Sequence, residues 1–290
     1  MELPLVVGVD GSDTSLRAVD WAVGEAALRG APLRLVYASL WERYEGTAFA
    51  GEMGQTSEPV QADTIVDAAA QRAHRREADV KISTEVLLDE PVPALLDEGR
   101  NACALVLGSR GRSGIAELLL GSVCLAVAAR ADCPVIVLRG SHDNRARPAT
   151  HGRVVVGVGE VPESSAAVRF AVQEAAHRGV SLEAVRAWRC PAHETTDHPL
   201  LTGEPARLHE QRAASLLEAA LLNLPVEVEL HRRTVEGPAQ KALLAASADA
   251  DLLVVGARRR HGRFGLQLGR VAHAVLHHSA CPVAVVPQRV

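Results

Sequence analysis

The chain has 290 residues, of which 48% are hydrophobic and 23% charged, and its formal net charge is −4. These values are typical of a soluble globular protein, and so small a charge gives no indication of nucleic-acid binding. No apolar run approaches the roughly 20 residues that span a bilayer, so we expect no membrane association. MELPLVV enters a strand pattern at once, which argues against a signal peptide, and five cysteines without metal-ligand spacing fit a reduced, cytoplasmic protein.

Apolar runs of strand length alternate with helical patterns along the first half of the chain. The run 3–9 (LPLVVGV) ends in the turn signal Asp10-Gly11-Ser12, and apolar positions at helical spacing then fill 14–29 up to Gly30. A long irregular stretch occupies 41–59. The same patterns predict strands at 32–38, 81–88, 103–108 and 134–138, and helices at 60–78, within VPALLDEG and at 121–130.

This alternation predicts an α/β fold with a five-stranded parallel sheet that helices cover on both faces. Right-handed crossovers make such a sheet doubly wound, and its ligands bind at the carboxyl ends of the strands. With the strand order 3-2-1-4-5, strands one and four flank the point where the order reverses. Asp10 follows strand one and Gly108 ends strand four. The fold therefore predicts that these two residues face one crevice.

The second half of the chain repeats the first. The aligned segments are 5–30 with 154–179, at an offset of 149, and 131–138 with 279–286, at an offset of 148. A repeat of this length indicates two copies of one domain, each large enough to bury its own core. The polar, basic and Pro-containing seam SHDNRARPAT predicts these boundaries: a first domain at 1–140, a linker at 141–150 and a second domain at 151–290.

A glycine-rich loop follows the fourth strand. It reads Gly108-Ser-Arg-Gly111, then nine residues, then Gly121-Ser122. Glycine allows close approach of the backbone to a ligand, successive N–H groups form an anion nest, and a helix that begins at Gly121-Ser122 offers free N–H groups. Asp10 supplies a carboxylate suited to ribose hydroxyls. The residues alone leave two interpretations open: a phosphate site, or a turn followed by a helix with Ser122 as its N-cap.

The second half keeps the spacing of this loop and loses its residues. Its copy reads Gly256-Ala-Arg-Arg259, nine residues, Gly269-Arg270, and the residue in place of Asp10 is Gly159. A lost hydrogen bond to a charged acceptor costs about 1.5–3 kcal/mol, and a left-handed non-glycine residue adds roughly 1–2 kcal/mol. We therefore expect nucleotide affinity to be about two to four powers of ten lower there. The arginines would fill the vacated crevice or bind another anion.

Other polar clusters receive plainer interpretations. His193 and His198 are five residues apart in a loop, which does not match the helical HExxH spacing. His273 and His277 are one helical turn apart, a spacing that permits metal ligation, but surface or interface histidines are expected. No metal site is predicted. Nothing resembles paired catalytic carboxylates or an activated nucleophile, so no catalytic residue is assigned.

VVGVDGS, the G-x2-G-x9-G-S loop and the closing DCPVIVL strand closely resemble the universal stress protein family. The resemblance covers nearly all of both halves and implies two tandem Rossmann-like domains of the adenine nucleotide alpha hydrolase-like type. The implied ligand is ATP, with or without Mg²⁺. Asp10 would bind ribose, and the other implied nucleotide-binding residues are Gly8, Val9, Ala38, Leu107, Gly108, Gly111, Gly121, Ser122 and Val123.

The resemblance implies a stress-linked regulatory protein that holds ATP in its first domain and changes partner binding with nucleotide occupancy. Family members pair through their last strand, so a tandem chain would form that pairing internally, between 133–138 and 281–286, or as a homodimer. The protein partner is unknown. Two alternatives stay open: an enzyme that hydrolyses ATP slowly or transfers its phosphoryl group, and an interaction module that works without nucleotide.

Overall fold

The computed structural model describes residues 2–39, 58–110, 120–139, 151–159, 166–190, 204–222, 224, 228–258 and 268–288. The chain forms two compact units, Met1–Arg147 and Pro148–Val290. Several segments singled out in the sequence lie outside the described residues: most of 41–59, Gly111, the linker 141–150, the segment 193–198 and Arg259.

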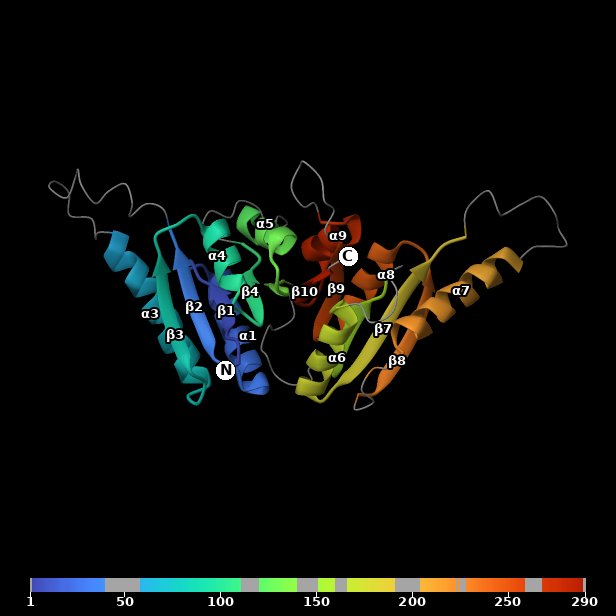
Figure 1. The fold of residues 1–290 in the computed structure, drawn as a ribbon, viewed down its shortest axis with the longest axis horizontal. Coiled ribbons are helices and arrows are strands. Elements are labelled where there is room, and N and C mark those ends of the chain that lie inside the picture. Colours follow the sequence, from blue (N-terminus) through green and yellow to red (C-terminus); the bar gives the residue numbers. More distant parts are fainter. Residues whose placement is uncertain are drawn as a thin grey trace. The chain divides into compact units, whose positions relative to one another are not determined.

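Unit one is built on five parallel strands (Figure 1). Its elements are β1 (Leu5–Gly8), α1 (Asp13–Arg29), β2 (Leu33–Ala38), α3 (Glu58–Arg76), β3 (Ile82–Leu87), α4 (Pro91–Gly99), β4 (Ala104–Gly108), α5 (Ser122–Arg130) and β5 (Val135–Leu138). The strand order is β3-β2-β1-β4-β5. Helix α1 packs on α3, and α4 packs on α5, which covers the two faces of the sheet. The doubly wound α/β fold expected from the sequence is confirmed, including its strand order.

Unit two repeats this plan in the order β8-β7-β6-β9-β10, again all parallel. Its elements are β6 (Arg153–Gly157), α6 (Ala166–Arg178), β7 (Ser181–Trp188), α7 (Glu204–Ala220), β8 (Leu230–Glu236), α8 (Ala239–Ala246), a 3₁₀ turn (Ser247–Asp249), β9 (Leu252–Arg258), α9 (Arg270–His278) and β10 (Val283–Gln288). The two halves of the chain are thus two copies of one Rossmann-like fold.

Local sequence explains where α1 begins and ends. Ser12 is the N-cap, with an extended backbone, and its hydroxyl accepts a hydrogen bond from the backbone N–H of Ser15. At the other end Gly30 adopts the left-handed conformation (φ 66°) and its N–H returns to carbonyls of the last turn. The start of α1 is therefore fixed directly behind the end of β1, where the predicted site lies.

Each unit buries a glutamate at the same point of its first helix. Glu25 on α1 is 0% exposed, and its Oε1 accepts a hydrogen bond from Nε of Arg29 at 2.6 Å. Glu174 on α6 is also 0% exposed, and its Oε2 accepts a hydrogen bond from Nη1 of Arg178. A buried carboxylate is tolerated where a close cation compensates its lost hydration. The two pairs are 149 residues apart, the offset of the sequence repeat.

Candidate functional site

The crevice of unit one lies where β1 and β4 end side by side. Gly8 of β1 pairs with Leu107 of β4, so the residues that follow each strand leave the sheet at the same edge. Gly108 is packed against the start of α1: a Cβ at this position would stand 2.7 Å from the backbone carbonyl of Thr14. Only glycine permits this approach without moving the backbone. The sequence prediction that the ends of these two strands converge is confirmed.

Hydroxyl groups at the start of α1 fix the groups around the crevice. Ser12 donates to Oδ1 of Asp10 twice, from its hydroxyl at 2.6 Å and from its backbone N–H at 3.0 Å. The hydroxyl of Thr14 donates to the backbone carbonyl of Arg110, two residues beyond β4. These bonds hold the Asp10 carboxylate in one orientation and tie the beginning of the glycine loop to α1.

The glycine loop returns to its starting point. The backbone N–H of Gly121 donates to the carbonyl of Ser109 at 2.8 Å, so the start of α5 lies beside the end of β4. Gly121 is the N-cap of α5 and makes no side-chain capping bond. Ser122 is the first helical residue and is exposed, so it is not the N-cap considered as an alternative above. The first turn of α5 therefore presents its backbone N–H groups at the crevice.

Most of the predicted site residues gather at this edge of the sheet. Val9 donates its backbone N–H to Val36 of β2 at 2.9 Å, and Ala38 ends β2 two residues further on. Val9 and Leu107 are buried, at 5% and 4% exposure. The residues that the structure places here are Gly8, Val9, Asp10, Ala38, Leu107, Gly108, Gly121, Ser122 and Val123. Their contacts with a ligand stay a prediction, as does the whole contribution of Gly111.

Sequence reasoning missed the part played by Ser12 and Thr14. The sequence gives Ser12 only as part of a helix-start signal and gives Thr14 no role, yet their hydroxyls reach Asp10 and the carbonyl of Arg110. The contact between Thr14 and Arg110 spans 96 residues of sequence. Only the tertiary fold brings such residues together, so a local pattern could not have shown it.

In unit two an arginine occupies the corresponding edge. Gly159 stands in place of Asp10, and a Cβ there would meet no described atom within 4 Å. Arg186 of β7 is 7% exposed and donates through Nη1 to the carbonyls of Val158, at 3.4 Å, and Gly159. Gly157 pairs with Val185 as Gly8 pairs with Val36, so Arg186 takes the place of Tyr37. The sequence signal, an arginine inside an apolar strand, went unnoticed.

The copy of the glycine loop in unit two also has different surroundings. A Cβ on Gly256 would stand 2.4 Å from Nε2 of Gln288, the end of a flexible side chain. Arg270 is the first residue of α9, after the N-cap Gly269, and is exposed. On the same helix the rings of His273 and His277 stack, with centroids 4.4 Å apart.

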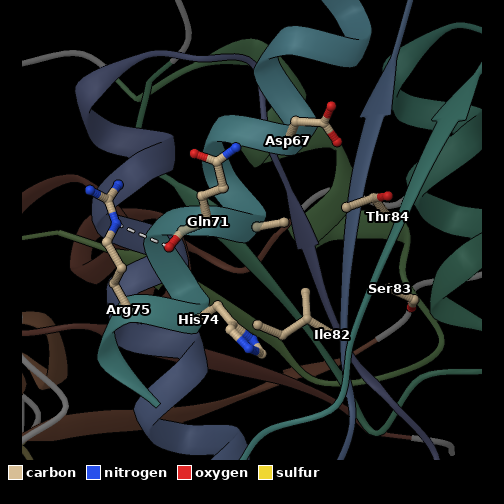
Figure 2. Close-up of a pocket in the computed structure, with 8 residues that line it drawn as sticks. Asp67, Gln71, His74, Arg75, Ile82, Ser83 and Thr84 are labelled. Carbon is tan, nitrogen blue, oxygen red and sulfur yellow. Dashed lines mark hydrogen bonds between the residues drawn. The ribbon is translucent and has the colours of Figure 1, made fainter. Parts of the chain in front are cut away.

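A separate groove of about 690 Å³ lies between α3 and the first residues of β3 (Figure 2). Its lining residues are Asp67, Ala70, Gln71, His74 and Arg75 of α3 with Ile82, Ser83 and Thr84 of β3. The groove lies beside the amino-terminal half of β3, whereas ligands of doubly wound sheets bind beyond the carboxyl ends of the strands. This groove is therefore distinct from the crevice, and no sequence motif indicated it.

Across the described ranges, no helix has the length and apolar character needed to cross a membrane.

Two doubly wound α/β units in tandem, with a closed glycine loop at the strand-order reversal of the first, define the class of tandem Rossmann-like proteins. The universal stress protein family model matches residues 3–139 and 150–287. One universal stress protein of Mycobacterium tuberculosis is 35% identical, with 98% of this chain and 97% of the relative covered. A second from that organism is 34% identical, with 99% and 96% covered. The chain belongs to the universal stress protein family.

A solved structure extends the likeness to both units together. The crystal structure of a universal stress protein from Archaeoglobus fulgidus is similar with a TM-score of 0.67 and 18% identity. The match covers 99% of this chain and 98% of that one. The shared feature is the tandem fold.

Proposed function

We propose that unit one binds an adenine nucleotide, ATP, in the crevice between the ends of β1 and β4. One hydrogen bond carries the proposal. The backbone N–H of Gly121 donates to the carbonyl of Ser109 at 2.8 Å, which places the start of α5 beside Gly108. The first turn of a helix has free backbone N–H groups, and this contact places the first turn of α5 beside the end of β4. Phosphate oxygens are the ligands that such an arrangement favours.

Each side of the crevice suits a different part of the nucleotide. Asp10, held by Ser12, would accept hydrogen bonds from ribose hydroxyls. The first turn of α5 and the hydroxyl of Ser122 would donate to phosphate oxygens. Val9, Ala38 and Leu107 offer the apolar surface on which a base would lie. Mg²⁺, where present, would accompany the phosphates and neutralise part of their charge.

We assign a regulatory role to this binding, within a stress response in the cytoplasm. Family membership supports the link to stress. In this proposal nucleotide occupancy of unit one alters which protein partner the chain binds, and unit two is structural or regulatory. Arg186 supports that division because its guanidinium already engages the backbone at the position of Asp10.

Calorimetric titration of the full chain with ATP and Mg²⁺ tests the proposal, and stoichiometry is the first quantity to determine. We expect one site per chain. Asp10→Ala removes a charged acceptor, so affinity should fall by about tenfold to 150-fold. Gly159→Ala is the matched control in unit two, has room for its Cβ, and should change nothing.

Two outcomes would contradict this account in different ways. Two sites per chain would show that the arginines of unit two replace the lost contacts. No binding by the folded chain would exclude the nucleotide function and favour an interaction module that works without nucleotide.

A further inference from the structure

One side of β3 has no partner strand among the described residues. The N–H of Leu33 donates to the carbonyl of Lys81 at 2.9 Å, and that of Ser39 to the carbonyl of Leu87 at 3.1 Å, so both carbonyls point toward β2. Backbone groups alternate in direction along a strand, and those of Ile82, Thr84 and Val86 therefore point away from β2. Within the described part of the chain β3 pairs with β2 only. The strand thus presents an open row of donors and acceptors.

The groove between α3 and β3 runs beside this open edge (Figure 2). Ile82 and Thr84 point toward α3, and Ser83 points to the other side of the strand. The wall formed by α3 is polar and exposed: His74 lies near Ile82, and Asp67 lies near Thr84. A chain laid along β3 would therefore meet backbone groups on one side and hydrogen-bonding side chains on the other.

The corresponding edge of unit two is protected by charge. Leu33 pairs with Ile82 and Leu182 pairs with Leu230, so Arg232 on β8 takes the position of Thr84. Its Nε lies 2.8 Å from Oε1 of Glu218 on α7, an ion pair that spans from strand to helix. Charged side chains on edge strands oppose the addition of another strand. Arg232 thus places a charge on the outer strand of unit two at the position where unit one has Thr84.

Unit one lacks the ion pair from outer strand to helix: the charged residue of β3, Glu85, lies instead 3.5 Å from Arg34 of β2. Ser83 and Thr84 are small, uncharged and exposed, and no ion pair among the described residues joins β3 to α3. Serine and threonine also pair readily across neighbouring strands. The same supersecondary structure is thus closed by charge in one unit and open in the other.

We propose that the groove between α3 and β3 is a docking site for an extended peptide segment of a partner protein, which adds to β3 as a new strand. The open backbone groups of Ile82, Thr84 and Val86 specify an extended chain, because only such a chain matches their spacing. Polar groups on α3 orient it. His74 favours a hydrogen-bonding carboxylate near the start of β3, and Asp67 favours a basic side chain near Thr84.

The test selects peptides from a random phage-displayed decapeptide library on the full chain and measures the affinity of the resynthesised peptide by fluorescence anisotropy. Thr84→Arg copies the residue of unit two, and we expect affinity to fall at least tenfold. Ser215→Arg, at an exposed serine of α7 in unit two, is the matched control: it adds the same charge away from the groove, and should change affinity less than threefold. Thermal unfolding confirms that both variants fold.

A second measurement reports on the backbone itself. Bound peptide should slow amide hydrogen exchange at least tenfold at Ile82, Thr84 and Val86, and leave Ser83 and Glu85 unchanged because they already face β2. Thr84→Pro removes one outward N–H and should lower affinity at least tenfold. The proposal is overturned if no peptide is selected, if Thr84→Arg binds as tightly as the parent chain, or if protection falls on other residues. Each outcome is independent of nucleotide binding.

Discussion

The carboxyl ends of β1 and β6 have the same backbone and opposite charge. Val9 N–H reaches the carbonyl of Val36 at 2.9 Å, and Val158 N–H reaches that of Val185 at the same distance. Beyond this shared hydrogen bond, the Asp10 carboxylate of unit one accepts a hydrogen bond from Ser12. In unit two, the guanidinium of Arg186 donates to the carbonyl of Gly159. The difference teaches that the charge at the end of a strand can be inverted by replaced side chains while the sheet beneath them stays unchanged.

The largest expected effect comes from Gly108, the last residue of β4. In Gly108→Ala the new Cβ would stand 2.7 Å from the backbone of Thr14, so the loop or α1 must move. We expect ATP affinity to fall by about a hundredfold, because overpacking of 1–3 kcal/mol falls on the phosphate loop itself. Calorimetric titration of the full chain measures this loss.

Gly256→Ala in unit two is the matched control for Gly108→Ala. Its Cβ meets only the end of the Gln288 side chain, which can rotate away, so ATP affinity should stay within twofold of the parent chain. Equal losses in the two variants would break the comparison, since they would show that both loops hold nucleotide.

A smaller effect, on the stability of the chain, is expected when Arg186 of unit two is replaced. Arg186→Met removes a donor from the carbonyls of Val158 and Gly159, and we expect unfolding free energy to fall by about 1–3 kcal/mol. Urea unfolding of the full chain measures it. Arg212→Met, at an exposed arginine of α7, should stay within about 0.5 kcal/mol. If Arg186→Met instead creates a second ATP site, the arginine blocks a crevice that is otherwise competent.

The smallest expected effect is the change in stability with pH that the buried thiols of both units cause. Burial raises the pKa of Cys124 and Cys133 in unit one, and of Cys281 in unit two, from 9.0 to about 12. Above pH 9 the unfolded chain loses these protons while the folded chain keeps them, so stability falls as pH rises. Between pH 8 and 10 each thiol should contribute a loss of about 1.4 kcal/mol.

Alanine substitution isolates that contribution. Cys124→Ala and Cys281→Ala should each reduce the loss of unfolding free energy between pH 8 and 10 by about 1.4 kcal/mol relative to the parent chain. Ser215→Ala, at an exposed serine of α7, is the control and should leave the pH dependence unchanged. An identical pH dependence in all four chains would contradict the assigned cause.

The sequence was sufficient for the fold because inner strands such as β1, β4 and β5 are continuous apolar runs and the segments between strands have apolar positions at helical spacing. Asp10 and Gly108 could be placed together from strand order alone. The bond from Thr14 to Arg110 could not, because it depends on a close approach across 96 residues. Arg186 was missed for a related reason: its place in β7 can be predicted locally, but the carbonyls that it reaches belong to the two residues that follow β6.

The buried pairs Glu25–Arg29 and Glu174–Arg178 lie at equivalent positions and bear on how the two units arose. Their equal spacing implies that an ancestor with a single domain already carried the pair, and that both descendants inherited it. Asp10 and Gly159, by contrast, differ at equivalent positions. The two copies thus share the buried pair that their folding requires and differ at the end of the first strand, where folding sets no such requirement.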